Sequence, residues 1–573
     1  MNIATSKGIS EHHFPVDFAS AAPSSVALSA ASASTASKQC AAELPRIALH
    51  QLEMRCGVAA SASARSATAS AHSSPAPPSI AAQQATGQTA ATRFRLPNDI
   101  WTSVTAFLPL QDVVNLRATS KEINVQVDAA ISTLKVRGVD LERFLNSSSL
   151  KHIKTLCLED IRIDQLRLLA QHLHARPGPK LNLTLQGHYE TNAAGLQPLT
   201  ELPLATLALN GFSPHSAPAT LTACAFPLAL SGTFSRETLL AAVSIPTLDA
   251  LTTDALYLDA DIARRLATHP ALRLLSIEDA WHAAEPLKAL ATCPFSVEVS
   301  GHLSADVLMA AAGIPTLKKL VTVCFGMNVE IAAGLSKLTA LHMLAFVMHH
   351  QTPPQTLQLL AAIPSLRALS VEDFDYGIFD PGIFDVDSVH ILASNANLET
   401  LTTDNLSITE ESFNVLSQAQ TLTTLSTSLR SNMLALGNMQ FLRNLTFNNP
   451  LCVHVSTTLD AASAQSIASL SALRSISFPA MLHSGDALAS IFEKTNATTI
   501  AFTGDVKFFP NALSALTANN KLKSLTFTQC ELTPEVHYAA LHHPTIDRVV
   551  LHDTAFRRRP GHPFLIPIST KDA

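Results

Sequence analysis

The sequence is poor in charged and aromatic residues. Charged side chains make up 15% of the 573 residues, aromatic ones make up 5%, and the formal net charge is −6. Binding to nucleic acid or to an anionic membrane through long-range electrostatics needs a basic surface, so this balance argues against both kinds of partner. The hydrophobic fraction of 47% is nevertheless enough for a large core.

Closely spaced cysteines and long apolar runs are also missing. No cysteine pair has the spacing of a zinc knuckle or a redox dithiol, so we expect reduced thiols that pack as small apolar side chains. No run of about 18 uninterrupted apolar residues occurs, and we predict no membrane span. The eight cysteines are Cys40, Cys56, Cys157, Cys224, Cys293, Cys324, Cys452 and Cys530.

Catalytic patterns are absent as well. There is no Gly-rich phosphate loop, and many of the 23 histidines lie in short turn-like motifs such as THPAL (268–272) and HHPTI (542–546). His349 and His350 follow an expected strand, but no cysteine or carboxylate accompanies them at metal-ligand spacing. We therefore predict no metal, no cofactor and no chemistry performed by the chain itself.

Residues 1–92 form a Ser/Ala-rich leader that we expect to be disordered. Its small side chains bury too little area to offset the entropy of ordering a backbone. Two interpretations remain open: a passive tail, or a targeting segment of the transit-peptide or type III secretion kind. Residues 42–55 (AELPRIALHQLEMR) are the one stretch with helical apolar spacing, and they could bind a partner.

A repeat of about 24 residues occupies most of the remaining chain. Each unit has Leu-x-x-Leu followed, two residues on, by an apolar residue or Thr. Degenerate copies fall near 296 and 498, looser ones before 235, and insertions near 375–390 and 449–465. We expect sixteen or seventeen units. Clear copies are LDALTT (248–253), LRLLSI (272–277), LKKLVT (317–322), LHMLAF (341–346), LRALSV (366–371), LETLTT (398–403), LTTLST (422–427), LRNLTF (442–447), LRSISF (473–478) and LKSLTF (522–527).

This pattern resembles the leucine-rich repeat family over about 400 residues. One strand and one short helix per unit cannot bury a core alone, so the units should stack into an α/β solenoid. A strand has a period of two, and the fourth and sixth motif positions should therefore face the core. These positions include Leu251 and Thr253, Leu275 and Ile277, Leu344 and Phe346, Leu369 and Val371, Leu445 and Phe447, Ile476 and Phe478, and Leu525 and Phe527.

The sequence departs from the family at the strand exit. The usual repeat has Asn or Cys eight residues after its first leucine, where it satisfies backbone groups. Only Cys530 conforms, and the place otherwise holds residues such as Leu256 and Ala280. Either other groups satisfy the backbone hydrogen bonds at this place, or the turns differ from those of the family. The curvature of the solenoid therefore cannot be predicted from the family pattern.

The alternate strand positions, three, five and seven, should form the second face of the sheet. They are mostly Ser, Thr, Asn and acidic residues, with an apolar strip at 319–347. Such strands can simply be well-solvated β-structure. The functional interpretation is a protein-binding surface with an apolar anchor. The candidate substrate-binding residues are Lys319, Val321, Val323, Met343, Ala345 and Val347.

Residues 93–135 precede the repeats as an expected helix pair broken at Pro109. The pair could be a cap that shields the first repeat. It also resembles the F-box: the order Leu-Pro, acidic residue, apolar pair, Leu-Pro, Asp-Val-Val, Leu-Arg and Ser-Lys recurs over about 30 residues. The family's closing Arg-Trp is replaced by Glu122-Ile123. The matching positions are Leu96, Pro97, Asp99, Ile100, Trp101, Val104, Phe107, Leu108, Pro109, Asp112, Val113, Val114, Leu116, Arg117, Ser120 and Lys121.

The resemblance implies docking on the Skp-family adaptor of a cullin–RING ubiquitin ligase, while the repeats hold a substrate protein nearby. The chain would then be a non-catalytic adaptor. The adaptor-binding residues that it implies are Leu96, Pro97, Ile100, Val104, Leu108, Pro109 and Val113.

The arrangement as a whole is similar to the F-box–leucine-rich-repeat effectors of plant-pathogenic bacteria. GDALA (485–489) approaches the motif for which the GALA group is named. The resemblance implies type III secretion into a host cell, with the cytoplasm or nucleus of a eukaryote as the alternative location.

The sequence leaves two other functions to consider. The first is a scaffold that binds and blocks a host protein without ubiquitination. The second is a self-contained ubiquitin ligase, for which repeats over 140–556 and a tail over 557–573 leave little room. The basic run Arg557–Arg559 in that tail is expected to be solvated.

Overall fold

The structure is a computed structural model, and its described residues all belong to one compact unit, Leu49–Ala573. The described ranges are 133–145, 153–174, 180–189, 193–212, 218–323, 327–348, 353–373, 386–404, 410–428, 433–448, 459–478, 487–504, 508–551, 554–558 and 565–568.

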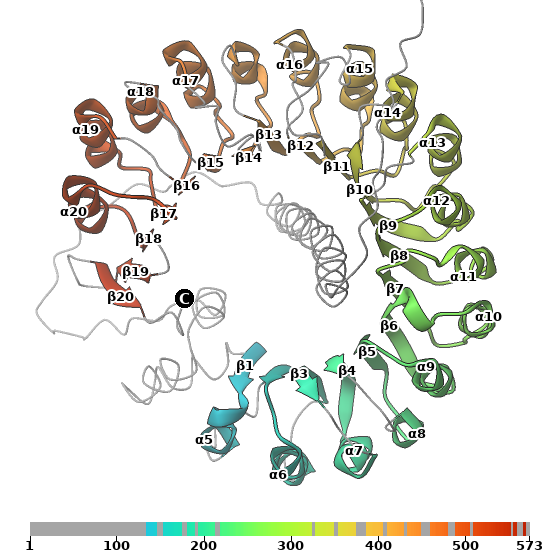
Figure 1. The fold of residues 1–573 in the computed structure, drawn as a ribbon. Coiled ribbons are helices and arrows are strands. Elements are labelled where there is room, and N and C mark those ends of the chain that lie inside the picture. Colours follow the sequence, from blue (N-terminus) through green and yellow to red (C-terminus); the bar gives the residue numbers. More distant parts are fainter. Residues whose placement is uncertain are drawn as a thin grey trace, which may run out of the picture. The chain divides into compact units, whose positions relative to one another are not determined.

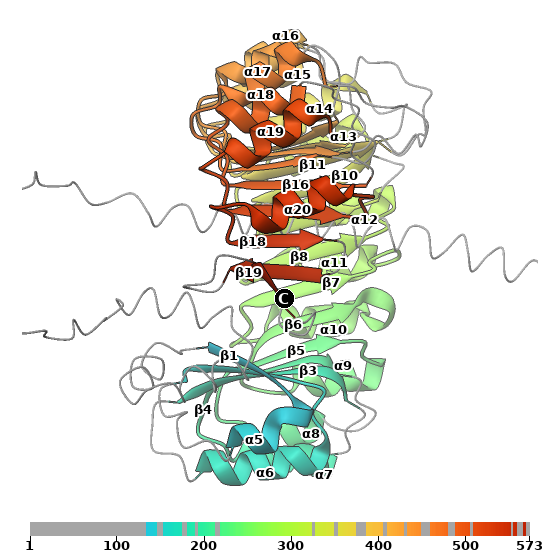
Figure 2. The ribbon, with the colours of Figure 1, turned by 90° about the vertical axis from the view of Figure 1, so that its left-hand side faces the viewer.

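One 20-stranded sheet runs through these residues. The strands follow one another as rungs in chain order (Figure 1; Figure 2). They are β1 Thr133–Arg137, β2 Thr155–Glu159, β3 Leu181–Tyr189, β4 Leu204–Phe212, β5 Leu228–Gly232, β6 Leu248–Asp254, β7 Leu274–Glu278, β8 Ser296–Gly301, β9 Leu317–Thr322, β10 Met343–Met348, β11 Ala368–Asp373, β12 Thr400–Asp404, β13 Thr424–Ser428, β14 Asn444–Asn448, β15 Ser475–Phe478, β16 Thr499–Thr503, β17 Ser524–Thr528, β18 Arg548–Leu551, β19 Thr554–Arg558 and β20 Leu565–Ile568.

Helices connect the strands and cover one face of the sheet (Figure 1). The α-helices are α5 Leu141–Leu145, α6 Ile163–His174, α7 Ala193–Thr200, α8 Pro218–Leu221, α9 Arg236–Val243, α10 Ala260–Ala267, α11 Ala284–Ala289, α12 Ala305–Ala312, α13 Val329–Leu335, α14 Pro354–Ala361, α15 Val386–Ser394, α16 Glu410–Leu416, α17 Ala461–Ala468, α18 Ala487–Lys494, α19 Pro510–Ala518 and α20 Pro534–His542. Short 3-10 helices are η1 Gly138–Asp140, η3 Ala255–Tyr257 and η4 Leu434–Asn438.

The strand order confirms the predicted α/β solenoid. Each strand from β1 to β17 pairs in parallel with the next one along the chain. Parallel neighbours need a crossover, and the helix of each unit supplies it. The degenerate copies near 296 and 498 are the strands β8 and β16.

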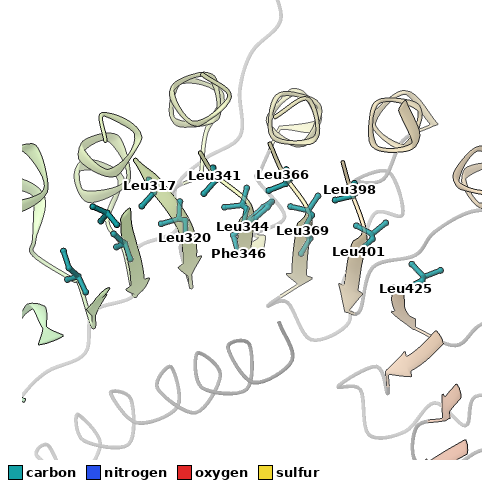
Figure 3. Packing of buried hydrophobic residues seen from close by; sticks show 14 of the residues in the cluster. Leu317, Leu320, Leu341, Leu344, Phe346, Leu366, Leu369, Leu398, Leu401 and Leu425 are labelled. Atoms are coloured by element: carbon teal, nitrogen blue, oxygen red, sulfur yellow. The ribbon is translucent and has the colours of Figure 1, made fainter. Parts of the chain in front are cut away.

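The predicted inward positions are confirmed by their burial. Leu344, Leu369 and Leu525 each have at most 1% of their surface exposed, as does Thr253. Figure 3 shows leucines such as Leu320 and Leu344 lying between strands and helices, where leucines of successive units meet. Stacking thus buries a core that no single unit could form.

Polar residues begin many of the helices. Ser235, Asp259, Ser304, Asn328 and Asp460 each accept a hydrogen bond from a backbone N–H in the first turn of the helix that follows. Such caps satisfy amides that have no partner inside the helix. The capping residue therefore fixes where each of these short helices, about eight residues long, begins within its unit.

The ends of the array differ in part from the prediction. Strand β1 begins at Thr133, within the range expected for the helical module 93–135. At the other end, β19 runs antiparallel to β18, and β20 runs antiparallel to β19. The prediction of a solvated side chain is wrong for Arg558, which is half-buried and donates from Nε to the carbonyl oxygen of Ile546 at 3.0 Å.

Candidate functional site

The face of the sheet opposite the helices is the first candidate interaction surface, and we call it the open face. It carries the alternate strand positions, such as Thr252 on β6, Ser276 on β7 and Thr526 on β17, all half-buried. These side chains do not pack against the helices, because a strand sends successive residues to opposite faces. The predicted polar second face is therefore present.

The six candidate substrate-binding residues lie together on the open face of β9 and β10. Register pairs Lys319 with Met343 and Val321 with Ala345. Val321, Val323, Ala345 and Val347 form an apolar cluster separate from the main core, with Met343 packed against it. Each of these four side chains is at most 4% exposed, so the accessible ones among the six candidates are the half-buried Lys319 and Met343.

At the exit of β17, Cys530 fills the place of the family's Asn or Cys, and its Sγ donates to the carbonyl oxygens of Phe502 and Thr528. Other exits, such as that of β7 with Ala280, have no Asn or Cys at this place. Backbone amides take over: Ala280 N–H donates to the carbonyl oxygen of Ser300 at 3.1 Å, and Gly504 N–H donates to that of Thr528 at 2.7 Å. Asp279 and Gln529 adopt left-handed backbone conformations, with φ of 49° and 56°. Both explanations left open by the sequence therefore apply: other groups satisfy the backbone, and the turns differ from those of the usual repeat.

In several units an Asn or His side chain between the helix and the next strand contacts a backbone carbonyl oxygen of the preceding unit. His269 Nε2 lies 2.9 Å from the carbonyl oxygen of Ile245, and the Asn395 amide nitrogen lies 2.9 Å from that of Ile363. Asn519 and His543 make equivalent contacts with Phe492 and Leu516. The short motifs around His269 and His543 are thus structural, because each ring contacts a backbone carbonyl oxygen about one unit earlier in the chain.

Two neighbouring exit turns present large apolar side chains to solvent. After β6, Leu256 is 71% exposed and Tyr257 is 43% exposed. After β7, Trp281 is 39% exposed, and its ring centroid lies 4.6 Å from that of His302. Leu256 occupies one of the positions where the family has Asn, yet it points outward because η3 replaces the usual turn.

The same two strands end in carboxylates. Asp254 and Glu278 are register partners at the ends of β6 and β7, and Asp279 follows Glu278. Two arginines of the adjoining helices contact carboxylates: Arg236 Nε lies 2.6 Å from Asp259 Oδ2, and Arg264 Nη1 lies 2.5 Å from Asp261 Oδ1. The turns that carry the exposed rings thus follow strands that end in carboxylates. We call Leu256, Tyr257, Trp281, Asp254 and Glu278 the exit patch.

An apolar groove opens on the helical side, between α19 and α20. Its volume is about 610 Å³, and Leu513, Pro534, Tyr538 and Ala539 contribute to its lining. Tyr538 is 65% exposed and stacks on His542, with ring centroids 3.9 Å apart. Glu535, His542 and His543 also line the groove.

The described thiols are packed in the manner that the sequence predicts. Cys224, Cys293 and Cys530 are buried, and Cys157 is partly buried. Burial raises the pKa of Cys224 to about 11, so this thiol is protonated and unreactive at neutral pH. Within the described residues no group of three His, Cys, Asp or Glu side chains is arranged to hold a metal, and no helix could span a membrane.

The adaptor-binding residues implied by the F-box resemblance lie outside the described residues. They all precede Thr133, where the described part of the chain begins. His349 and His350 are outside it as well, as are the leader 1–92 and the motif at 485–486.

Comparison with known proteins adds little beyond the fold. No family model and no curated protein matches the sequence. The crystal structure of an internalin (inlF) from Listeria monocytogenes str. 4b F2365 is similar with a TM-score of 0.36 and 15% identity, over 63% of this chain and 93% of that one. The TLR13–ssRNA13 complex has a TM-score of 0.36 and 17% identity, over 74% of this chain and 56% of that one.

This chain thus spans little more than half of the TLR13 chain. Likenesses at this level carry no conclusion about function. The chain is a leucine-rich-repeat α/β solenoid because of its parallel strand order and its repeating inward leucines.

Proposed function

We propose that this protein is a substrate-recruiting F-box subunit of a cullin–RING ubiquitin ligase. The sequence around Leu96-Pro97 and Leu108-Pro109 carries the proposal, because it matches the F-box order over about 30 residues. The solenoid supports the substrate-binding part of the proposal, since repeat arrays expose long surfaces suited to binding proteins. The chain would bring a substrate close to the ubiquitin-loaded enzyme, and it would perform no chemistry itself.

Adaptor docking would use the apolar side chains of the helix pair. The proposed contacts are Leu96, Pro97, Ile100, Val104, Leu108, Pro109 and Val113. The substrate would bind the open face, where Lys319 and Met343 are accessible at the edge of the apolar cluster on β9 and β10. The low exposure of that cluster means that a substrate meets these two side chains first.

A pull-down with purified Skp-family adaptors tests the docking. We expect the full chain to capture an adaptor and the double variant Leu96→Ala/Pro97→Ala to lose capture by at least about tenfold. Leu434→Ala is a matched control, because Leu434 is 47% exposed in η4 and contributes to the repeats alone. Capture that survives the double variant, or no capture by the full chain, would reject the proposal.

The alternative is a scaffold that blocks a host protein without ubiquitination. The solenoid favours it to the same degree, since its binding surfaces do not require residues 93–135. Substrate abundance separates the two functions: proteasome inhibition should restore a lost substrate only if the chain acts as a ligase subunit. A substrate bound at unchanged abundance would support the scaffold.

We further propose that the leader 1–92 directs type III secretion into a host cell. Its support is compositional: the leader is rich in Ser and Ala, and acidic residues are few. A reporter enzyme fused to residues 1–92 should reach host cytoplasm from a secretion-competent strain and not from a secretion-deficient one. Equal delivery from both strains, or from neither, would reject this role.

A further inference from the structure

A row of residues runs along the side of the sheet where the strands begin, and we call it the entry row. Each member is the second residue of its repeat motif. Its backbone N–H donates to the carbonyl oxygen of the member in the preceding unit, over distances between 2.7 and 2.9 Å. Neighbouring members therefore lie about one strand spacing, ~4.8 Å, apart. From β12 to β18 the members are Glu399, Thr423, Arg443, Arg474, Thr498, Lys523 and Asp547.

The middle of the entry row is basic. Arg443, Arg474 and Lys523 are exposed, and they belong to the units of β14, β15 and β17. The exposed Lys521 lies two residues before Lys523, and its Nζ donates to Asn496 Oδ1 at 2.8 Å in the unit between. Four cationic side chains thus gather along four consecutive strands. We call Arg443, Arg474, Lys521 and Lys523 the basic edge.

The basic edge has no carboxylate to neutralise it. Among the described residues, no Asp or Glu oxygen lies at ion-pair distance from any of its four side chains. Two earlier members of the entry row are paired instead. Arg273 Nε lies 3.2 Å from Asp249 Oδ1, and Arg367 Nη1 lies 3.9 Å from Glu399 Oε1. The charge of the basic edge is therefore left for groups outside the described fold.

Two of these cations are direct neighbours. Arg474 N–H donates to the carbonyl oxygen of Arg443 at 2.7 Å, and the residues that follow them, Asn444 and Ser475, are register partners. Like charges on neighbouring strands repel each other and lower stability. No ion pair within the described residues compensates for this repulsion. The pair is thus arranged to receive negative charge from a partner.

The length of the basic edge indicates the kind of partner. From Arg443 to Lys523 it spans three strand spacings, ~14 Å, which an extended peptide covers with about four to five residues. Acidic members of the entry row lie beyond both ends, the half-buried Glu399 and the exposed Asp547. A nucleic acid would extend past these carboxylates, and the net charge of −6 would repel it further. A short acidic peptide meets only the cations.

From this juxtaposition we infer that the basic edge is a docking site for a short Asp- or Glu-rich segment of a partner protein. Carboxylates of the segment pair with the guanidinium groups of Arg443 and Arg474, each of which can donate two parallel hydrogen bonds, and a further carboxylate meets Lys523. The site is separate from Lys319 and Met343 on the open face. It goes beyond the proposed function and does not depend on adaptor docking, since it would serve a ligase subunit or a scaffold.

Fluorescence polarisation with the full chain tests the inference. Two probes are fluorescein-labelled hexapeptides, identical except that the four central residues are Glu in one and Gln in the other. The third probe is a labelled single-stranded RNA of six nucleotides. We expect the Glu peptide to bind at least about fivefold more tightly than the Gln peptide, and added salt to reduce that difference. Equal binding of the two peptides would overturn the inference, and so would RNA binding as tight as that of the Glu peptide.

Variants locate the binding on the chain. Arg443→Gln/Arg474→Gln should remove most of the preference for Glu, and circular dichroism should remain unchanged because both side chains are exposed. Lys318→Gln/Lys337→Gln is the matched control, since it removes the same charge from exposed side chains on β9 and after α13. A preference that survives the arginine variant, or that falls equally in the lysine variant, would also overturn the inference. Adaptor capture, measured separately, should be the same in both variants.

Discussion

His543 is joined to Leu516 across a repeat boundary, with Nε2 of the buried ring 2.8 Å from the carbonyl oxygen of a residue 27 positions earlier. Its other ring nitrogen, Nδ1, lies 3.2 Å from the N–H of Thr545. The N–H donates to Nδ1, which assigns the proton of the neutral ring to Nε2. Asn519 uses its amide in the same way, donating to Phe492 and accepting from Leu522.

Loss of this link should destabilise the C-terminal units. His543→Ala leaves a buried carbonyl and a buried N–H without their partner, at a cost of about 2–3 kcal/mol. His543→Asn should cost less, because Asn519 and Asn395 occupy the equivalent place in other units. Urea unfolding followed by circular dichroism measures both, with the exposed His537→Ala as control. An equal cost for Ala and Asn would contradict the shared role.

The same ring makes stability depend on pH. Burial, followed by the charge of Arg558, lowers the pKa of His543 from its ordinary 6.5. The unfolded chain therefore takes up a proton first, so stability is complete above about pH 6.5 and falls as the pH drops toward the lowered folded pKa. Protonation would place a hydrogen on Nδ1, where Thr545 N–H now donates.

Thermal unfolding between pH 7.5 and 5 in the wild type and His543→Asn isolates this contribution. We expect the variant to lose less stability than the wild type as the pH falls through about 6. Identical pH profiles would show that His543 does not carry the effect.

A column of aromatic rings crosses the C-terminal units, and Phe502 lies at its centre. Its ring centroid is 5.4 Å from those of Phe478 and Phe527 on the neighbouring strands, and the side chain is fully buried. Phe502→Ala should cost about 3–5 kcal/mol, and Phe502→Leu should cost less because it leaves a smaller cavity. The half-exposed Phe441→Ala should change the unfolding free energy by less than about 0.5 kcal/mol. A small effect of Phe502→Ala would mean that the column can collapse around the cavity.

Gly301 is required where β8 ends. Its φ is +136°, and an added Cβ would lie 2.6 Å from the backbone nitrogen of Ala280. Gly301→Ala should therefore destabilise by about 2–3 kcal/mol, through backbone strain and the clash together. Hydrogen exchange should increase in β7 to β9, because the carbonyl oxygen of Gly301 also accepts from Val323 N–H. Unchanged exchange in these strands would contradict the argument.

The repeating core could be predicted because its physics is local to each motif. Leu344 and Phe346 alternate with Met343 and Ala345, and a strand sends such alternating residues to opposite faces. The helices could be predicted from their apolar spacing and from the prolines that come after them in the sequence. The second face and the position of the apolar strip followed from the same alternation.

Exposure within the candidate site could not be predicted in this way. The sequence places Val321 and Ala345 on the second face. It does not predict that both are fully buried there, because burial depends on which other side chains pack around them in the folded chain. Leu256 was noted as a departure from the family pattern, and its outward position depends on the 3-10 turn. Trp281 was not singled out, although a lone tryptophan in a polar turn was a usable signal.

By itself, the sequence determined the repeat period, the inward positions and the parallel stacking, because burial of one apolar face is a property of each short motif. The tertiary structure decided which groups satisfy each other between units and how β19 and β20 end the sheet. The contacts between units join residues about one unit apart, so their partners are set by stacking and not by local pattern.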